Sequence, residues 1–155
     1  MGFFFRSVGL LLALAGTAKL QAATGEARIL GDYDPLFHFR LKLMMSTVGL
    51  IELLVAWVMF SNAITPLKRA VAVLWLGSCF AAYHIGLKEI GFHGYCACLG
   101  NIFATIGISN NAASKIMSGI ILYMLTGGIV MLLLMWRQQK MLKSSTQNRH
   151  ELTRI

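Results

Sequence analysis

Long apolar stretches alternate with short polar segments along the whole chain, and this alternation is the first feature to interpret. A helix needs about 20 predominantly apolar residues to cross a hydrocarbon core of about 30 Å. Stretches of that kind occupy residues 3–23, 42–63, 70–87 and 116–136. The pattern therefore predicts an all-α fold, a four-helix bundle of transmembrane helices, rather than a soluble domain.

The first stretch has an alternative interpretation as a secretory signal. Arg6 precedes a short apolar run from Val8 to Ala15, as in such signals. Small residues suited to cleavage are poorly spaced around Ala22 and Ala23, and Lys19 interrupts the approach. We therefore expect an uncleaved helix. A cleaved signal would leave the rest of the topology unchanged.

Composition agrees with the membrane assignment. Of the 155 residues, 57% are hydrophobic and only 13% are charged, and the mean hydropathy is +0.67. A soluble domain carries a larger charged fraction. The net charge of +8 does not indicate nucleic-acid binding, because the basic residues lie in short runs beside apolar stretches. That placement is typical of membrane topology signals and of contact with anionic lipid headgroups.

The distribution of basic residues predicts an orientation with both termini in the cytoplasm. This arrangement puts eight Lys and Arg residues inside and six outside, in the sense of the positive-inside rule. The expected organisation is a transmembrane domain over 1–136, with an outer loop over 88–115, and a basic cytoplasmic tail over 137–155. The inner membrane of a bacterium, with that loop facing the periplasm, is the expected location.

Lys19 and Glu52 carry opposite charges inside predicted helices. A charged carboxylate such as Glu52 costs about 3 kcal/mol near the centre of a membrane helix, so it is expected to be neutral, paired or turned inward. Lys19 is its natural partner, because a lysine side chain spans much of the expected difference in depth. Two interpretations stay open: an ion pair that only fixes helix packing, and a proton relay.

His84 and Cys79 belong to the third stretch. Gly77, Phe80 and Ala81 share a helix face with His84. A histidine on such a face is more often a hydrogen-bonded packing residue than a ligand, although its depth would let it support proton or quinone chemistry. Cys79 is expected to be a small buried hydrophobic residue.

The most specific local pattern is the segment His93-Gly-Tyr-Cys96-Ala-Cys98 in the expected outer loop. A disulfide between Cys96 and Cys98 would close a small, strained ring, and strained disulfides are easily reduced, as relay bonds are. Together with His93, the two cysteines could instead bind copper or zinc as soft ligands. A structural bridge or free thiols are the remaining interpretations.

These segments together resemble the DoxX-like membrane proteins. The similarity covers roughly Arg6 to Trp136 and rests on Gly16-Thr-Ala-Lys19-Leu20, on Gly49-Leu-Ile-Glu52-Leu and on the Cys96-Ala-Cys98-Leu-Gly motif, which resembles the MauE branch. The resemblance implies a four-helix membrane fold with redox associations. In the MauE branch these are disulfide handling during maturation of a periplasmic methylamine dehydrogenase, with a thioredoxin-like partner; DoxX relatives are linked to thiosulfate–quinone oxidoreduction. Ala97 stands where that motif frequently has proline.

The expected function is a thiol–disulfide relay that acts on a periplasmic partner through Cys96 and Cys98, with quinone as the candidate cofactor. Lys19, Glu52 and His84 are the candidate supporting residues. A non-catalytic accessory subunit of a larger electron-transfer complex is the alternative, and a metal-binding protein is the third. The lipid bilayer is an expected partner in each case.

Overall fold

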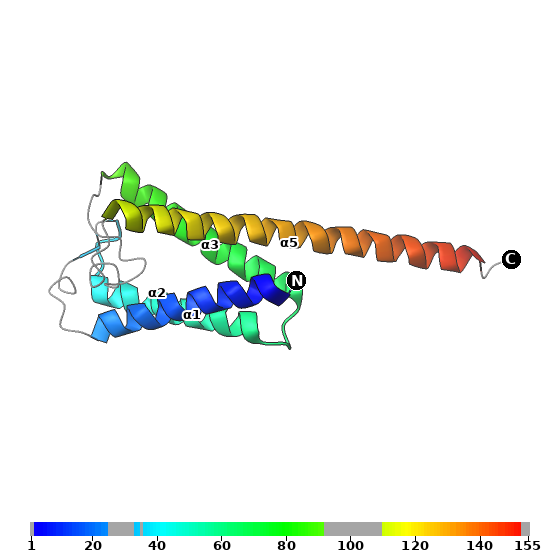
Figure 1. The fold of residues 1–155 in the computed structure, drawn as a ribbon, viewed down its shortest axis with the longest axis horizontal. Coiled ribbons are helices and arrows are strands. Elements are labelled where there is room, and N and C mark those ends of the chain that lie inside the picture. Colours follow the sequence, from blue (N-terminus) through cyan, green and yellow to red (C-terminus); the bar gives the residue numbers. More distant parts are fainter. Residues whose placement is uncertain (1, 25–32, 35, 92–109, 153–155) are drawn as a thin grey trace.

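The computed structural model describes residues 2–24, 33–34, 36–91 and 110–152. Within them the chain forms helices α1 (Gly2–Thr24), α2 (Leu41–Phe60), α3 (Pro66–Glu89) and α5 (Asn110–Leu152). Figure 1 shows them side by side, with the N-terminus and the link between α2 and α3 at one end of the bundle. The turn over 33–40, the end of α3 and the start of α5 lie at the other end.

The prediction of four membrane-spanning helices is confirmed by length and composition. Four segments of the described residues are each long and apolar enough to cross a bilayer: Gly2–Thr24, Leu41–Phe60, Pro66–Glu89 and Ala112–Gln138. Large apolar side chains also cover the outward faces of these helices, including Leu14, Leu54, Trp57, Leu122 and Leu133. A multi-pass membrane protein in a lipid environment is therefore indicated.

Helix boundaries differ from the sequence prediction at the second link and at the C-terminal end. α2 ends at Phe60, and α3 starts at Pro66 with Thr65 before it. Proline fits the first turn of a helix, where its missing N–H has no partner to lose. α5 extends well past residue 136, so the basic tail continues the helix of the last span as far as Leu152.

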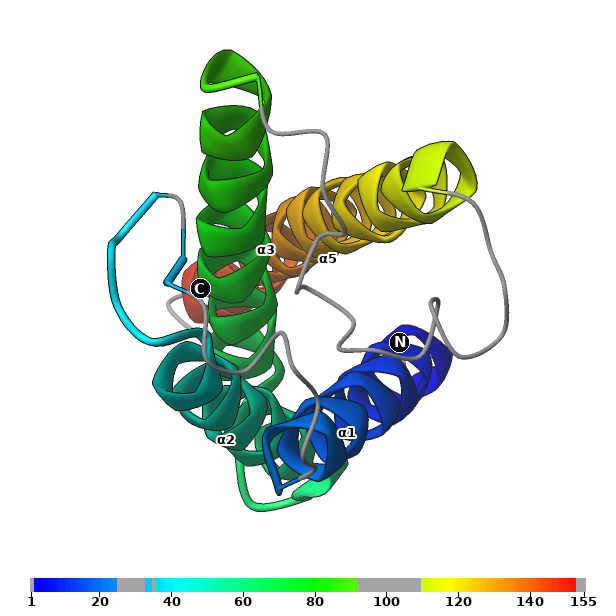
Figure 2. The ribbon, with the colours of Figure 1, turned by 90° about the vertical axis from the view of Figure 1, so that its left-hand side faces the viewer.

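The bundle is built from two tightly packed pairs, α1 with α2 and α3 with α5, which Figure 2 shows from the end. Helices α2 and α3 are consecutive in the chain, but they contact each other far less. The core between the pairs consists of apolar side chains such as Phe5, Val8, Met59, Val73 and Met124. At the N-terminal end of α1, Ser7 shares a hydrogen bond of 2.7 Å with Tyr123 of α5.

Candidate functional site: a buried ion pair beside an apolar cavity

Glycine allows α1 and α2 to approach closely next to the charged residues. A β-carbon at Gly16 would lie 2.8 Å from the carbonyl oxygen of Gly49, and one at Gly49 would lie 3.0 Å from the carbonyl oxygen of Gly16. Gly16 precedes Lys19 by three residues and Gly49 precedes Glu52 by three, so each glycine shares a helix face with its charged neighbour. The same close contact therefore brings the two charges together.

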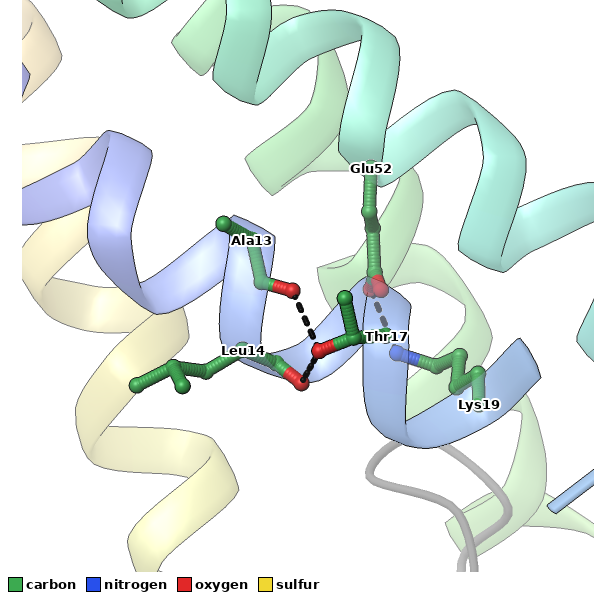
Figure 3. A network of polar contacts seen from close by, with 5 residues as sticks. All are labelled: Ala13, Leu14, Thr17, Lys19 and Glu52. Atoms are coloured by element: carbon green, nitrogen blue, oxygen red, sulfur yellow. Dashed lines mark hydrogen bonds and ion pairs between the residues drawn. The ribbon is translucent and has the colours of Figure 1, made fainter. Parts of the chain in front are cut away.

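Lys19 and Glu52 form an ion pair inside the bundle. The Nζ atom of Lys19 lies 2.5 Å from Oε1 of Glu52, and each side chain is only 2% exposed (Figure 3). The second carboxylate oxygen, Oε2, is buried without a hydrogen-bond partner among the described residues. A buried charge is tolerated when it is paired, and each member of this pair requires the other.

The lysine side of the pair faces a cavity of about 450 Å³ between α2, α3 and the turn over 33–40. Lys19 is the charged residue in its lining, and Glu52 is not part of the lining. The other lining residues are apolar or aromatic: Leu36, Phe37, Leu41, Met44, Met45, Val48, Ile51, Trp75, Leu76, Cys79, Phe80, Ala82 and Tyr83. The cavity occupies the space that the limited contact between α2 and α3 leaves open.

An aromatic ring also contributes to the environment of the ammonium group. The ring centroid of Phe80 lies 5.8 Å from Nζ of Lys19. The negative face of an aromatic ring attracts a cation at this range. The ammonium is therefore held by the Glu52 carboxylate and an aromatic ring that lines the cavity, and it has N–H donors beyond the one that Glu52 uses.

His84 is hydrogen-bonded to α5 and not to the ion pair. Its Nε2 atom is 3.2 Å from the Ser118 hydroxyl on α5, and that hydroxyl donates its proton to the Ser114 carbonyl at 3.0 Å. The pattern assigns the ring proton to Nε2, and Nδ1 is buried without a partner among the described residues. This geometry agrees with a packing residue that joins α3 to α5, and His84 does not line the cavity.

Cys79 does not have the environment expected from sequence. It was predicted to be a buried hydrophobic residue, but it is exposed and lines the cavity. The prediction was wrong because an apolar neighbourhood in sequence does not tell which helix face meets another helix.

The Cys96 and Cys98 pair and His93 lie outside the described residues. In the described part of the chain no cluster of three or more His, Cys, Asp or Glu side chains could hold a metal ion. The metal site over His93, Cys96 and Cys98 thus stays an untested expectation.

Asp34 is a residue of this region that the sequence analysis did not single out. The structure buries its side chain completely. Its Oδ1 accepts hydrogen bonds from the backbone N–H groups of Leu36 and Phe37, both at 2.9 Å, and its Oδ2 accepts one from the Tyr83 hydroxyl at 2.6 Å. An aspartate next to a proline and an aromatic residue is a turn signal, but nothing in the sequence connects it with Tyr83.

Comparisons with protein-family models, with curated proteins and with solved structures found no match to this chain.

Proposed function

We propose that this chain is a membrane redox protein in which a quinone occupies the cavity beside Lys19 and accepts electrons from the Cys96 and Cys98 thiols. The observation that carries the proposal is a cavity with aromatic walls and one buried ammonium group. Ligand sites of this kind, mostly apolar with few polar groups, fix the orientation of an apolar molecule.

The charge of the site favours a neutral ligand. Glu52 balances Lys19 at 2.5 Å, so the pair as a whole has no net charge with which to attract an anion. The ammonium can nevertheless donate a hydrogen bond to a carbonyl oxygen. A quinone offers such an oxygen on a flat ring that stacks against Trp75 or Phe80, both of which line the cavity.

The reaction balances as a two-electron exchange. Cys96 and Cys98 lose two electrons and two protons as a disulfide forms between them, and the quinone takes up both as a quinol. A partner dithiol would then reduce the disulfide again by thiol–disulfide exchange, becoming oxidised itself. The resemblance to DoxX-like and MauE-like proteins supports this assignment, as does the position of Gly91 and Asn110, which flank the cysteine segment at the cavity end of the bundle.

Ligand binding can be tested through Trp75, which lines the cavity. In a Trp57→Phe, Trp136→Phe background, Trp75 is the remaining tryptophan of the chain. Titration with a short-chain quinone in detergent should quench its fluorescence saturably. Ala82→Leu, which fills the cavity from α3, should weaken that quenching, and unsaturable quenching that Ala82→Leu leaves unchanged would contradict the site.

Electron transfer is tested separately on the reduced protein in liposomes. Addition of the short-chain quinone should make Cys96 and Cys98 unreactive towards a maleimide and should form one quinol per chain. Cys96→Ser with Cys98→Ser should form none. Thiols that remain fully reactive after the quinone is added would rule out the relay, leaving an accessory subunit as the alternative.

A further inference from the structure

The turn over 33–40 is hydrogen-bonded to α3 through the buried carboxylate of Asp34. Asp34 binds two backbone N–H groups of its own turn and the Tyr83 hydroxyl of α3. Its backbone N–H and carbonyl also bond to the Phe39 carbonyl at 2.8 Å and to the His38 N–H at 2.9 Å. Asp34 thus holds the turn in shape and fastens it to α3 at the same time.

The residues fastened by Asp34 form one wall of the cavity. The Phe37 and Tyr83 rings are stacked with centroids 6.1 Å apart, and both rings line the cavity. Leu36 lies against α3 at Gly86, where an added β-carbon would come within 3.0 Å of it, and it also lines the cavity. Displacement of the turn would therefore remove two side chains from the cavity wall.

We infer that Asp34 and Tyr83 form a latch that keeps the turn over 33–40 closed on the cavity, with Asp34 as a positioning residue for the ligand. Opening of the latch connects the cavity with water at the end of the bundle away from the N-terminus. The inference rests on the proposed function in so far as the cavity holds a ligand, but closure itself can be measured without one.

The contacts of the turn with α3 explain why the turn acts as a latch and not as a permanent wall. Of the three hydrogen bonds to the Asp34 carboxylate, only the one from the Tyr83 hydroxyl joins the turn to α3, so it is the one lost when the turn lifts, whereas those from Leu36 and Phe37 move with the turn. The turn also contacts α3 through the Phe37–Tyr83 stack and through Leu36 at Gly86. A segment held by few contacts opens locally at a lower free energy than the packed helices do.

Cys79 provides a native reporter, since it is exposed on the cavity wall. In a Cys96→Ser, Cys98→Ser background it is the single thiol of the 155-residue sequence. A membrane-impermeant, charged maleimide reaches it only through water, whereas N-ethylmaleimide also reaches it through lipid. The ratio of the two labelling rates in liposomes without quinone therefore measures aqueous opening of the cavity.

Tyr83→Phe removes the hydroxyl and keeps the ring, and it should raise the labelling rate with the charged maleimide about fivefold, the factor by which loss of one ordinary hydrogen bond shifts an opening equilibrium. Asp34→Ala should raise the rate further. N-ethylmaleimide labelling should change little. The matched control is Tyr123→Phe, which loses a hydroxyl bonded to Ser7 far along α5 and should label as the parent does.

Three results would overturn the latch. The first is equal labelling of the parent, Tyr83→Phe and Asp34→Ala by the charged maleimide. The second is rapid labelling of the parent, which would mean that the cavity is already open. The third is an equal rise in Tyr123→Phe, which would indicate general loosening. Since none of these measurements contains quinone, failure of the latch is distinct from failure of the quinone site.

Discussion

At the scale of single residues, the pairing of Lys19 with Glu52 is the central feature of this protein. Both side chains are almost completely enclosed by the bundle. Removing one partner of a buried pair costs about 3–5 kcal/mol because the other is left as an uncompensated charge, whereas replacing both costs much less. The ion pair therefore affects both the packing of the bundle and the charge of the candidate site.

The pair predicts a characteristic double-mutant cycle. Lys19→Met and Glu52→Gln should each lower the free energy of unfolding in mixed micelles, Lys19→Met by about 3–5 kcal/mol. The double variant should be more stable than Lys19→Met alone, because no unpaired charge remains. Additive losses in the cycle would show that the two side chains do not stabilise each other.

His38 has a backbone conformation that disfavours most residues. Its φ is 56°, in the left-handed region, at the centre of the turn that Asp34 holds. A β-branched residue is especially strained there. The strain is local and should be visible in the stability of the turn.

We predict that His38→Val lowers the free energy of unfolding by about 1–2 kcal/mol. His38→Gly should stay close to the parent, because relief of the strain is offset by the greater chain entropy of glycine. Thermal unfolding of the detergent-solubilised protein measures both. A His38→Val variant as stable as His38→Gly would argue against a left-handed residue at this position.

At the scale of elements, small residues decide how closely α1 and α2 approach. Gly16 and Gly49 each face the backbone carbonyl of the other. Membrane helices commonly associate through such small residues, since no hydrophobic effect between helices operates in lipid. The contact of Gly16 with Gly49 emerged only from the fold.

Gly16→Ala should destabilise the protein by about 1–3 kcal/mol, the usual cost of adding a methyl group to a fully packed contact. Gly119→Ala on α5 is the matched control, because a β-carbon there meets nothing within 4 Å. That substitution should be neutral or slightly stabilising, by up to about 1 kcal/mol, through helix propensity. Equal effects of the two in thermal unfolding would contradict the close contact.

At the scale of the whole molecule, the four candidate spans of the described residues bring the start of α1 and the C-terminal turns of α5 to the same end of the bundle (Figure 1), as an orientation with both termini on one side would require. The distribution of basic residues favours the cytoplasm for that side. One end of the bundle holds the N-terminus and the last turns of the α5 span. The basic residues at that end are Arg6, Lys68, Arg69 and Arg137. The cavity and the 33–40 turn would then face outward.

This orientation predicts the behaviour of fusions in a bacterial host. A fluorescent protein that matures only in the cytoplasm should be bright when fused after Ile155, and an alkaline phosphatase that needs the periplasm should be inactive there. A phosphatase inserted after Gly91 should be active. The reverse pattern would place the cavity on the cytoplasmic side.

The sequence by itself determined the membrane class, the number of spans and the partnership of Lys19 with Glu52. These follow from local properties: apolar length, and the cost of leaving a charge unpaired in a helix. The prediction of helix ends was less accurate. The predicted second span ran past Phe60, where α2 ends, and the last helix continues to Leu152.

The tertiary structure alone decided the burial of Asp34, the cavity, the hydrogen bonding of His84 to α5, and the exposure of Cys79. Each of these depends on how helices rotate and splay against one another. Such rotation is set by side-chain packing between segments far apart in the chain, as between α1 and α2 at Gly16 and Gly49. A periodic apolar pattern does not encode it when a helix is apolar on all sides.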